Sequence, residues 1–324
     1  MISIRVPLRV SLFGGGTDIP DFFSSNRGTV SGFTIDRYIH KYASRIDINQ
    51  GFNFRLSYKS SQDANFIDEI KHPIFREVLR SYNFDKTYHF STMSCLPSGA
   101  GLGSSSSFTV GLHYVLNQIL NINDSPSELA RKAINIERNV LSESGGWQDQ
   151  LHAAYGGFNT FNFNKDGEID VNPIMLNSEN INNINDNMYI LYSGGMREAK
   201  KIEDSKKKNL NVDILKETYE LAKEGEALLR SNNFDLSDIG KFLNTGWELK
   251  RGMSTKVSND NLNDLYSLIL KSGAFGAKLC GAGGGGFFMV LANDKAISNL
   301  QLCLPKGSIS KINIDFNGLK RKDL

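Results

Sequence analysis

A glycine- and serine-rich segment, PSGAGLGSSSS at residues 97–107, constrains the fold of this chain more than any other stretch of sequence. Residues 88–96 before it alternate apolar and polar side chains as a strand does, and Pro97 ends the ladder. The apolar residues after it recur at helical spacing: Phe108, Leu112, Val115, Leu116 and Ile119. A flexible linker is the alternative that Gly and Ser alone would favour, but a linker does not join a strand to a helix in this way. The pattern therefore predicts a structured strand–loop–helix unit.

The composition of this loop indicates an anion site. Gly99, Gly101 and Gly103 allow tight turns that bring backbone N–H groups close to a ligand. The amino end of the following helix adds partial positive charge, and the serines at 104–107 offer hydroxyl groups to phosphate oxygens or a metal. No Gly-Lys-Ser/Thr follows, so the loop is not a Walker A loop.

Two further glycine clusters need interpretation. GAGGGG at 281–286 satisfies G-x-G-x-x-G, but it follows a helix and leads into the strand-like FFMVL, which excludes a dinucleotide-binding motif. A protein-kinase glycine loop is excluded because H-R-D and D-F-G are absent. Two roles remain open for GAGGGG, close backbone packing against another loop and contact with a ligand. FGGGTD at 13–18 is a turn after the strand predicted from residue 2. Thr17 and Asp18 either reach a polar ligand or cap this turn.

Two acidic residues stand out in the middle of the chain. A helix begins after Ser125, where S-P-S-E forms a capping box. Its apolar face comprises Leu129, Ala133, Ile136, Val140 and Leu141. Glu137 falls near the middle of that face, where a carboxylate needs a cation or several donors. An internal salt bridge and a magnesium ligand facing the phosphate loop are the two interpretations. Asp149 follows a Gly-Gly turn in SGGWQDQLHAAYGG and, as a loop residue, is either solvated or functional.

Length and composition set the class of protein. With 324 residues we expect about two domains, and 37 basic against 35 acidic residues argue against a dedicated nucleic-acid surface. Three widely spaced cysteines give neither a disulfide framework nor a zinc pattern. The beginning of the sequence lacks a signal-peptide pattern, and no apolar run approaches about 18 residues. A cytoplasmic protein without membrane contact is expected.

The remaining segments alternate between strand and helix patterns without strict βαβ order, which favours an α+β fold. Residues 40–48 and 52–58 predict a hairpin, and the Asn-rich stretch 177–187 predicts a surface loop near a domain boundary. Helices are expected at 212–230, 236–250 and 260–272, and strands at 287–292 and 311–316.

Taken together, the three glycine clusters and the two acids resemble the motifs of the GHMP kinases. PLRVSLFGGGTD (7–18) is similar to the first motif of this superfamily, PSGAGLGSSSS (97–107) to its phosphate-binding second motif, and KLCGAGGGGFF (278–288) to its third. Within the superfamily, GGGTD, GGWQDQ and YSGGMREA (192–199) resemble the heptose 7-phosphate kinases. The three motifs occur in order across most of the chain.

The resemblance implies a two-domain α+β fold. The amino-terminal domain (1–185) would be of the ribosomal protein S5 domain 2 type, and the carboxy-terminal domain (186–324) ferredoxin-like. The expected cofactors are ATP and Mg²⁺. ATP would be bound by Pro97, Ser98, Gly99, Ala100, Gly101, Leu102, Gly103, Ser104, Ser105 and Ser106. The metal would be held by Glu137 with Ser104 or Ser105.

For the acceptor side, Asp149 is the implied general base and Arg9 its neighbour. The sugar would contact Gly15, Gly16, Thr17, Asp18, Arg197, Gly283 and Gly284. Arg197 is the first candidate for a distal phosphate, and Lys200, Lys201 and Lys250 are weaker ones.

The implied reaction is phosphorylation of the anomeric hydroxyl of a heptose 7-phosphate to the 1,7-bisphosphate, which feeds nucleotide-activated heptose synthesis for surface polysaccharide. Alternatives are a fucose- or galactose-type 1-kinase, a catalytically silent sugar and ATP sensor, and an ATP-dependent decarboxylase. The expected partner is a small-molecule sugar phosphate, with no nucleic acid and no membrane; a homodimer is compatible with the sequence.

Overall fold

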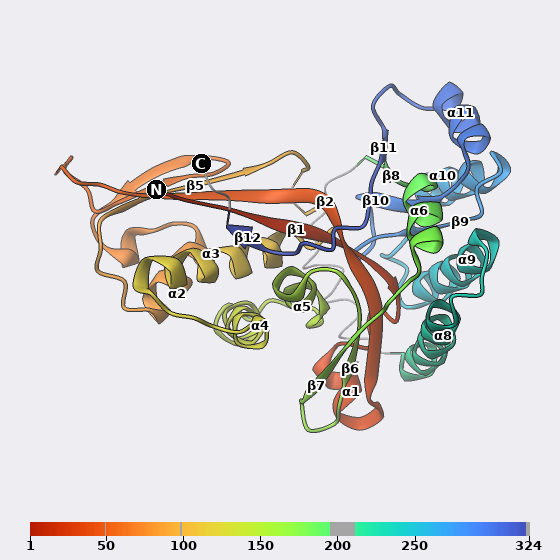
Figure 1. Ribbon diagram of the computed structural model, residues 1–324, viewed down its shortest axis with the longest axis horizontal. Coiled ribbons are helices and arrows are strands. Elements are labelled where there is room, and N and C mark those ends of the chain that lie inside the picture. Colours follow the sequence, from red (N-terminus) through yellow and green to blue (C-terminus); the bar gives the residue numbers. More distant parts are fainter. Residues whose placement is uncertain (49, 98, 195–210, 322–324) are drawn as a thin grey trace.

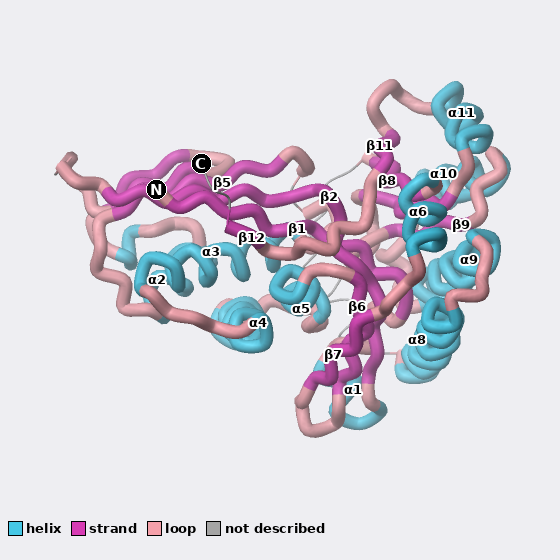
Figure 2. The backbone as a smooth tube through the Cα atoms, in the orientation of Figure 1, coloured by secondary structure: helices cyan, strands magenta, loops and turns pink. Residues whose placement is uncertain are grey.

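The chain folds into two β-sheets with helices packed around them (Figure 1). The computed structural model describes residues 1–48, 50–97, 99–194 and 211–321. Figure 2 shows the first sheet as a long arm with helices along one side, and the second sheet beside α9, α10 and α11. This mixture of helices and largely antiparallel sheets is the predicted α+β class.

The first sheet has eight strands and is organised by one long strand, β2 (Gly28–Arg45). β2 pairs with β1 along most of its length, with β6 through its first part and with β5 through its last part. The partners are β1 (Ile2–Phe13), β3 (Phe54–Ser57), β4 (Ser61–Ala64), β5 (Tyr88–Ser94), β6 (Phe158–Phe163), β7 (Ile169–Pro173) and β12 (Lys320–Arg321). The pairing of β1 with β2 shifts register between Pro7 and Leu8 and again between Ser11 and Phe13. Such irregularities bend a strand locally.

Helices cover one side of this sheet (Figure 1). They are α2 (Pro73–Ser81), α3 (Ser104–Leu120), α4 (Pro126–Ile134) and α5 (Gln148–Tyr155). A short helix, α1 (Pro20–Asn26), follows β1, and a 3₁₀ turn spans Ile67–Glu69. The capping box predicted at Ser125 and Glu128 begins α4, and a π-helical segment, Asn135–Val140, continues it.

The second sheet has the strand order β11-β8-β10-β9. Its elements are α6 (Ser178–Asp186), β8 (Met188–Tyr192), α8 (Val212–Ser231), α9 (Leu236–Gly252), α10 (Asp260–Lys271), β9 (Gly276–Leu279), β10 (Phe287–Leu291), α11 (Asp294–Cys303) and β11 (Ile309–Lys311). Alternate residues of β10 face different cores: Phe288 packs with Trp247 and Tyr266, whereas Met289 joins the core of the first sheet. The predicted boundary at residue 185 falls in α6, and the division into domains stays a prediction.

The last described residues return to the first sheet. β12 pairs with β1, and Asp315 donates its N–H to Thr34 O and accepts from the N–H of Gly157. A Cβ placed on Gly156, which ends α5, would stand 2.3 Å from the Cα of Gly318. Backbone segments far apart in sequence therefore touch directly at the carboxyl end of α5.

Three expectations were wrong. Residues 40–48 and 52–58 do not form a hairpin, because β3 pairs in parallel with β5 and antiparallel with β4. The Asn-rich stretch forms helix α6, capped by Asn177 and anchored by buried Ile184, because its few apolar residues share one face. The strand expected at 311–316 ends at Lys311; beyond it, Ile314 makes only an isolated bridge to Ile35.

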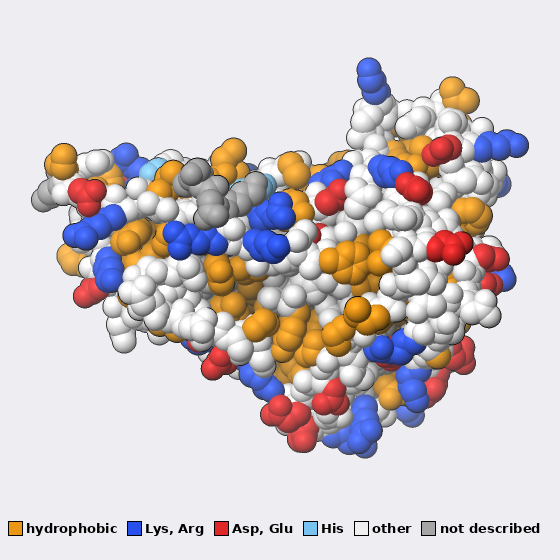
Figure 3. Space-filling model, in the orientation of Figure 1, with side chains coloured by type: hydrophobic (Ala, Val, Ile, Leu, Met, Phe, Trp, Pro, Cys, Tyr) orange, Lys and Arg blue, Asp and Glu red, His pale blue; other side chains and the backbone are white. Residues whose placement is uncertain are grey.

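Figure 3 shows side chains of both charge signs across one face of the molecule, in keeping with the small net charge. Among the described residues, the helices are all too short or too polar to span a bilayer.

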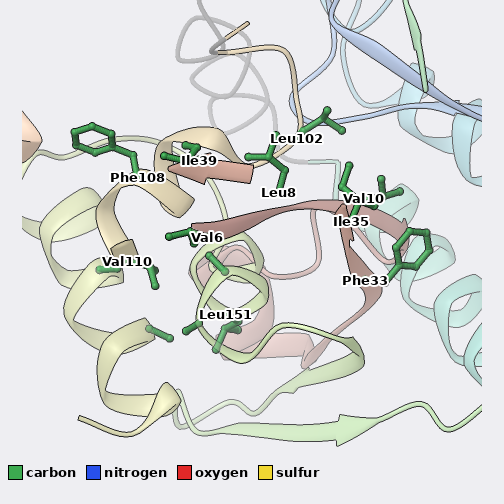
Figure 4. Close-up of a cluster of buried hydrophobic side chains, with 14 of the residues drawn as sticks. Val6, Leu8, Val10, Phe33, Ile35, Ile39, Leu102, Phe108, Val110 and Leu151 are labelled. Carbon is green, nitrogen blue, oxygen red and sulfur yellow. The ribbon is translucent and has the colours of Figure 1, made fainter. Parts of the chain in front are cut away.

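A continuous core beneath β1 and β2 fixes the elements that carry the candidate site. Figure 4 shows Val6, Leu8 and Val10 of β1 together with Phe108 and Val110 of α3 and Leu151 of α5. Leu102, in the glycine loop, lies close to Leu8 and is 2% exposed. Burial of such side chains stabilises each by about 1.5–3 kcal/mol. The glycine loop and α5 are therefore held to the same sheet.

Candidate active site

The three predicted glycine clusters meet at a cleft of about 540 Å³. Gly15 and Gly16 line it from the first cluster, Gly101 and Gly103 from the second, and Gly283 from the third. Its walls also carry Arg9, Asp18, Glu137, Arg138, Glu143, Asp149, Lys250 and Lys278. Four basic and four acidic side chains thus face one cavity.

The second and third clusters touch backbone to backbone. Gly101 has φ +87°, and a Cβ there would stand 2.6 Å from Cys280 O. A Cβ on Gly281 would stand 2.3 Å from the Cα of Gly101. Neither contact leaves room for a side chain, which explains the glycines in both motifs. The packing role considered for GAGGGG is therefore present; the cluster also lines the cleft, and its contact with a ligand stays a prediction.

The phosphate loop is anchored through its carbonyl groups. Ala100 O accepts from Phe287 N at 3.2 Å, Gly101 O from the Arg9 guanidinium at 2.6 Å, and Leu102 O from Arg9 N at 3.1 Å. In each peptide plane the N–H points opposite to the C=O, so the N–H groups of residues 101–103 point away from these anchors. Among the described residues, none of these three N–H groups donates a hydrogen bond. Together with the start of α3, they form a site for an anion.

Arg9 and Asp149 form an ion pair at the floor of the cleft. Arg9 Nε donates to Asp149 Oδ1 and Nη2 to Oδ2, both at 2.8 Å. The Arg9 side chain is 5% exposed and that of Asp149 is 24% exposed. Asp149 lies in the first turn of α5, not in a loop as expected. The predicted proximity of the two residues is present, and Arg9 also ties this pair to the phosphate loop through Gly101.

Glu137 is buried at the other side of the phosphate loop. Its carboxylate accepts hydrogen bonds from Ser106 at 2.9 Å, from Thr109 at 2.5 Å, and from the amide of Gln150. Burial raises the pKa of Glu137, while Arg138 and the hydroxyl groups of Thr109 and Ser106 oppose that rise. The internal salt bridge considered from the sequence is present, because Arg138 lies 3.7 Å away, and the magnesium role of Glu137 stays a prediction.

The residues around Glu137 fit a magnesium ion. Glu137 and Ser106 line the cleft next to the phosphate loop, and both offer the oxygen atoms that Mg²⁺ prefers. A cation there would offset the cost of the buried charge. Ser106, not Ser104 or Ser105, contacts Glu137: Ser104 instead accepts from Gly99 N, and Ser105 is exposed. Within the described ranges there is no group of three His, Cys, Asp or Glu, so substrate phosphates would complete the coordination.

The π-helical segment explains how two adjacent residues reach the cleft. Its wider turn places both Glu137 and Arg138 on the cleft wall. Arg138 donates to the carbonyl oxygen of Gly146 and so fixes the glycine turn before α5. Val140, expected on the buried face, is instead 49% exposed, because the wider turn rotates it outward.

Asp18 is held by donors of the protein itself. Its carboxylate accepts from Gly16 N and Gln148 N at 3.0 Å each and from Gln148 Nε2 at 3.2 Å. Burial raises the pKa of Asp18, and the two backbone N–H groups oppose the rise. A Cβ on Gly146 would stand 1.9 Å from Asp18 Oδ2, so the glycine turn closes directly over this carboxylate.

Several predicted ligand residues have other positions. Thr17 is fully buried, and its hydroxyl lies 2.8 Å from the carbonyl oxygens of Gly14 and Thr29, so it shapes the turn and does not face the cleft. Gly284 donates its N–H to Val257 O and is not part of the cleft wall. Ala100 and Leu102 are buried anchors, and Pro97 lies outside the cleft. Ser98, Arg197, Lys200 and Lys201 lie outside the described residues.

The sequence did not single out Ser11, Arg138, Gln148, Gln150 and Lys278. The ammonium group of Lys278 donates to Leu12 O at 2.7 Å, and that of Lys250 to Leu279 O and Gly281 O. Both amines thus join the third cluster to its neighbours while lining the cleft. Of these five residues, only Gln148 and Gln150 could have been found from the sequence, because they flank Asp149.

Comparison with known proteins places these features in a family. The family model "GHMP kinases N terminal domain" matches residues 68–157, and "GHMP kinases C terminal" matches residues 226–307. The chain is 32% identical over 335 aligned residues to a D-glycero-alpha-D-manno-heptose 7-phosphate kinase of Campylobacter jejuni, covering 98% of each. It is 27% identical to a bifunctional fucokinase/GDP-fucose pyrophosphorylase of Arabidopsis thaliana, over 90% of this chain and 30% of that one.

Solved structures have the same fold. A D-glycero-D-manno-heptose 1-phosphate kinase from Bacteriodes thetaiotaomicron superposes with a TM-score of 0.80 at 20% identity, covering 100% of this chain and 99% of the other. A sugar kinase described as putative, from Campylobacter jejuni, gives 0.73 at 24% identity, over 99% and 98%. With both family models matched and a relative aligned along almost its whole length, this chain belongs to the GHMP kinases and is an ATP-dependent phosphotransferase.

Proposed function

We propose that this protein transfers the γ-phosphate of ATP to the anomeric hydroxyl of a heptose 7-phosphate, giving the 1,7-bisphosphate. One observation carries the proposal: the Arg9–Asp149 ion pair lies where the phosphate loop meets the wall formed by the first glycine cluster. A carboxylate at that point lies between a phosphate donor and an alcohol acceptor.

The roles follow from the geometry. The amides of residues 101–103 and the start of α3 hold the triphosphate, because they point away from their carbonyl anchors. Glu137 and Ser106 would hold magnesium, which when bound neutralises charge on the β- and γ-phosphate oxygens. The acceptor oxygen forms a bond to the γ-phosphorus as the bond to ADP breaks, and Asp149 accepts the acceptor's proton. Arg9 orients Asp149 through two hydrogen bonds and stabilises negative charge.

The substrate assignment is supported by the overall sequence similarity and by local motifs within it. The heptose 7-phosphate kinase of Campylobacter jejuni aligns over 98% of this chain, and GGGTD and GGWQDQ resemble that subgroup. The distal phosphate needs a cationic pocket, for which Arg197 remains the sequence candidate and Lys250 and Lys278 are the lysines on the described cleft wall. The product would feed nucleotide-activated heptose synthesis for surface polysaccharide.

A fucose- or galactose-type 1-kinase is the second candidate, because a fucokinase-containing enzyme and galactokinases also align with most of this chain, at 27% identity or less. The sensor and decarboxylase hypotheses receive no such support.

The decisive experiment is a coupled ADP assay over heptose 7-phosphate, free heptose, fucose and galactose, with the phosphate position of the product read by ³¹P NMR. We expect turnover to be highest with the phosphorylated heptose and new phosphate at C1. Faster turnover of a free sugar contradicts the proposal, and ADP release without sugar phosphorylation contradicts any sugar kinase. Sedimentation would test the homodimer and fractionation the cytoplasmic location, which both remain predictions.

A further inference from the structure

Two buried oxygen atoms at the acceptor end of the cleft have no hydrogen-bond partner among the described residues. They are Ser11 Oγ and Gln148 Oε1. Both residues line the cleft. Ser11 lies on β1 two residues beyond Arg9, and Gln148 directly precedes Asp149 in α5. The two unsatisfied oxygens therefore lie beside the Arg9–Asp149 pair, where an acceptor sugar would bind. A buried polar atom left without a partner is costly, so a bound ligand is the natural partner.

Both side chains border the same small space above Gly15. A Cβ on Gly15 would stand 3.3 Å from Ser11 Oγ and 3.6 Å from Gln148 Nε2. Gly15 itself lines the cleft, and its backbone is outside the left-handed region, so it does not need to be glycine for conformational reasons. A side chain at this position would crowd Ser11 and Gln148, so glycine leaves both side chains open to the cleft.

Asp18 determines which atom of Gln148 is left for a ligand. An ionised carboxylate can only accept, and Asp18 Oδ1 takes a hydrogen bond from Gln148 Nε2. This fixes the amide with its oxygen directed away from Asp18. Three protein donors already use most of the roughly four acceptor positions of the Asp18 carboxylate. Asp18 therefore orients Gln148, and its expected contact with the sugar stays a prediction.

We propose that Ser11 and Gln148 determine sugar specificity by binding the hydroxyl on the carbon next to the phosphoryl acceptor. Gln148 Oε1 accepts a hydrogen bond from that hydroxyl, and the Ser11 hydroxyl donates one to the oxygen of the same sugar hydroxyl. The inference rests on the proposed function, in which the acceptor is the C1 hydroxyl, so the recognised group is the C2 hydroxyl. The pairs Arg9–Asp149 and Ser11–Gln148 are neighbours along β1 and α5, as the two hydroxyls of a vicinal diol are neighbours.

Gln148 Oε1 suits a hydroxyl donor and not an anionic group. A phosphate or carboxylate would face the acceptor oxygen of Gln148, with the Asp18 carboxylate behind it. The substrate class is therefore a sugar with a free hydroxyl adjacent to the acceptor carbon, and the distal phosphate must lie elsewhere. A site with buried hydrogen-bonding groups discriminates strongly against an analogue that lacks the matching hydroxyl.

The test compares Ser11→Ala and Gln148→Met on two substrates, the heptose phosphate and its 2-deoxy counterpart. With the full substrate, we expect the KM for the sugar to rise about tenfold in each variant. A tenfold rise corresponds to about 1.4 kcal/mol, which is the contribution of one hydrogen bond. The KM for ATP should not change. With the 2-deoxy sugar, variant and wild type should have equal KM values. An equal loss on both substrates would show that these residues only support the fold, and overturns the proposal.

Ser11→Ala removes a hydroxyl without breaking a described hydrogen bond, so its melting temperature should match wild type. If Gln148→Met fails to fold, Ser11→Ala decides alone, since a wild-type KM in that variant refutes the proposal. Gln301→Met, an exposed position on α11, is the matched control for the same substitution. Should the enzyme prefer another sugar, the same comparison with that sugar and its deoxy analogue separates this inference from the proposed function.

Discussion

At the end of the cleft where we propose that the triphosphate binds, the groups proposed to hold its phosphates are backbone amides, whereas at the proposed acceptor end they are side chains held by other side chains. The phosphate end depends on glycines that let two loops touch, as at Gly101 and Gly281. The acceptor end depends on pairs distant in sequence, Arg9 with Asp149 and Asp18 with Gln148.

The difference follows from what each end must recognise. A triphosphate carries dispersed charge that oriented amides can hold without regard to side-chain identity. A sugar hydroxyl needs a donor and an acceptor at defined positions, which only fixed side chains supply. We expect substitutions at the acceptor end to affect turnover or sugar binding, and substitutions at the phosphate end to affect ATP binding and stability together.

The largest effect is expected from Asp149→Asn. Loss of the proton acceptor should lower kcat by about 10²–10⁴-fold. ATP binding, measured by calorimetry, should persist because the phosphate loop is anchored by Arg9 through Gly101 O. Asp170→Asn, at an exposed position of β7, is the control. Turnover within a few-fold of wild type would show that Asp149 is not the base.

Glu137→Gln tests the metal at the phosphate end. Because a neutral amide replaces the buried carboxylate, the Mg²⁺ concentration for half-maximal activity should rise by about 10–100-fold, the range seen when a metal's supporting groups are lost. A magnesium titration checks this, with Glu224→Gln at an exposed position of α8 as control. An unchanged titration would remove Glu137 from the metal site.

Two glycines of the phosphate loop, compared with each other, test the contact between the second and third glycine clusters. Gly99 and Gly101 both have positive φ, but only at Gly101 would a Cβ meet backbone, 2.6 Å from Cys280 O. Gly101→Ala should therefore destabilise the protein by about 1–3 kcal/mol more than Gly99→Ala, with a weaker affinity for ATP. Thermal unfolding and ATP titration measure both, and equal losses would argue that the two loops are not tightly docked.

The last prediction concerns the stability of the protein in acid. Burial and the nearby Arg9 lower the pKa of His152 to about 3, so in the folded protein this ring stays neutral while the unfolded chain protonates below about 6.5. Stability should therefore fall as pH drops from 6.5 towards 3, by up to about 1.4 kcal/mol per unit from this residue. The raised pKa values of Asp18 and Glu137 act in the opposite direction. His152→Leu should flatten the dependence of Tm on pH; an unchanged slope would contradict this assignment.

Local patterns in the sequence predicted the phosphate end well. Pro97, the glycines and the helical spacing after Phe108 are all contained within one short segment, so the strand, loop and helix follow from neighbouring residues. The resemblance to GHMP kinases supplied the Arg9–Asp149 pair, which no spacing within the chain would reveal because its members come from β1 and α5.

The errors have a common physical cause. The pairing of β3 with β5 is a long-range choice that alternation alone cannot specify. The π-helical turn shifted Val140 outward, since ordinary helical periodicity does not include a wider turn. The sequence did not indicate that Ser106, in the first turn of α3, contacts Glu137; the metal-binding roles of Ser104 and Ser105 stay predictions. The Thr17 hydroxyl donates to a carbonyl oxygen of its own turn and therefore does not face the cleft.

The contact of Gly156 with Gly318 has a consequence for biosynthesis. The helix that bears Asp149 ends against a segment that the ribosome makes much later, so a nascent chain cannot fully fix this helix until residues 315–318 have emerged from the exit tunnel. Phosphoryl transfer should thus begin only once translation has passed this point, and fusions or truncations placed there should impair catalysis although they lie far from the cleft in sequence.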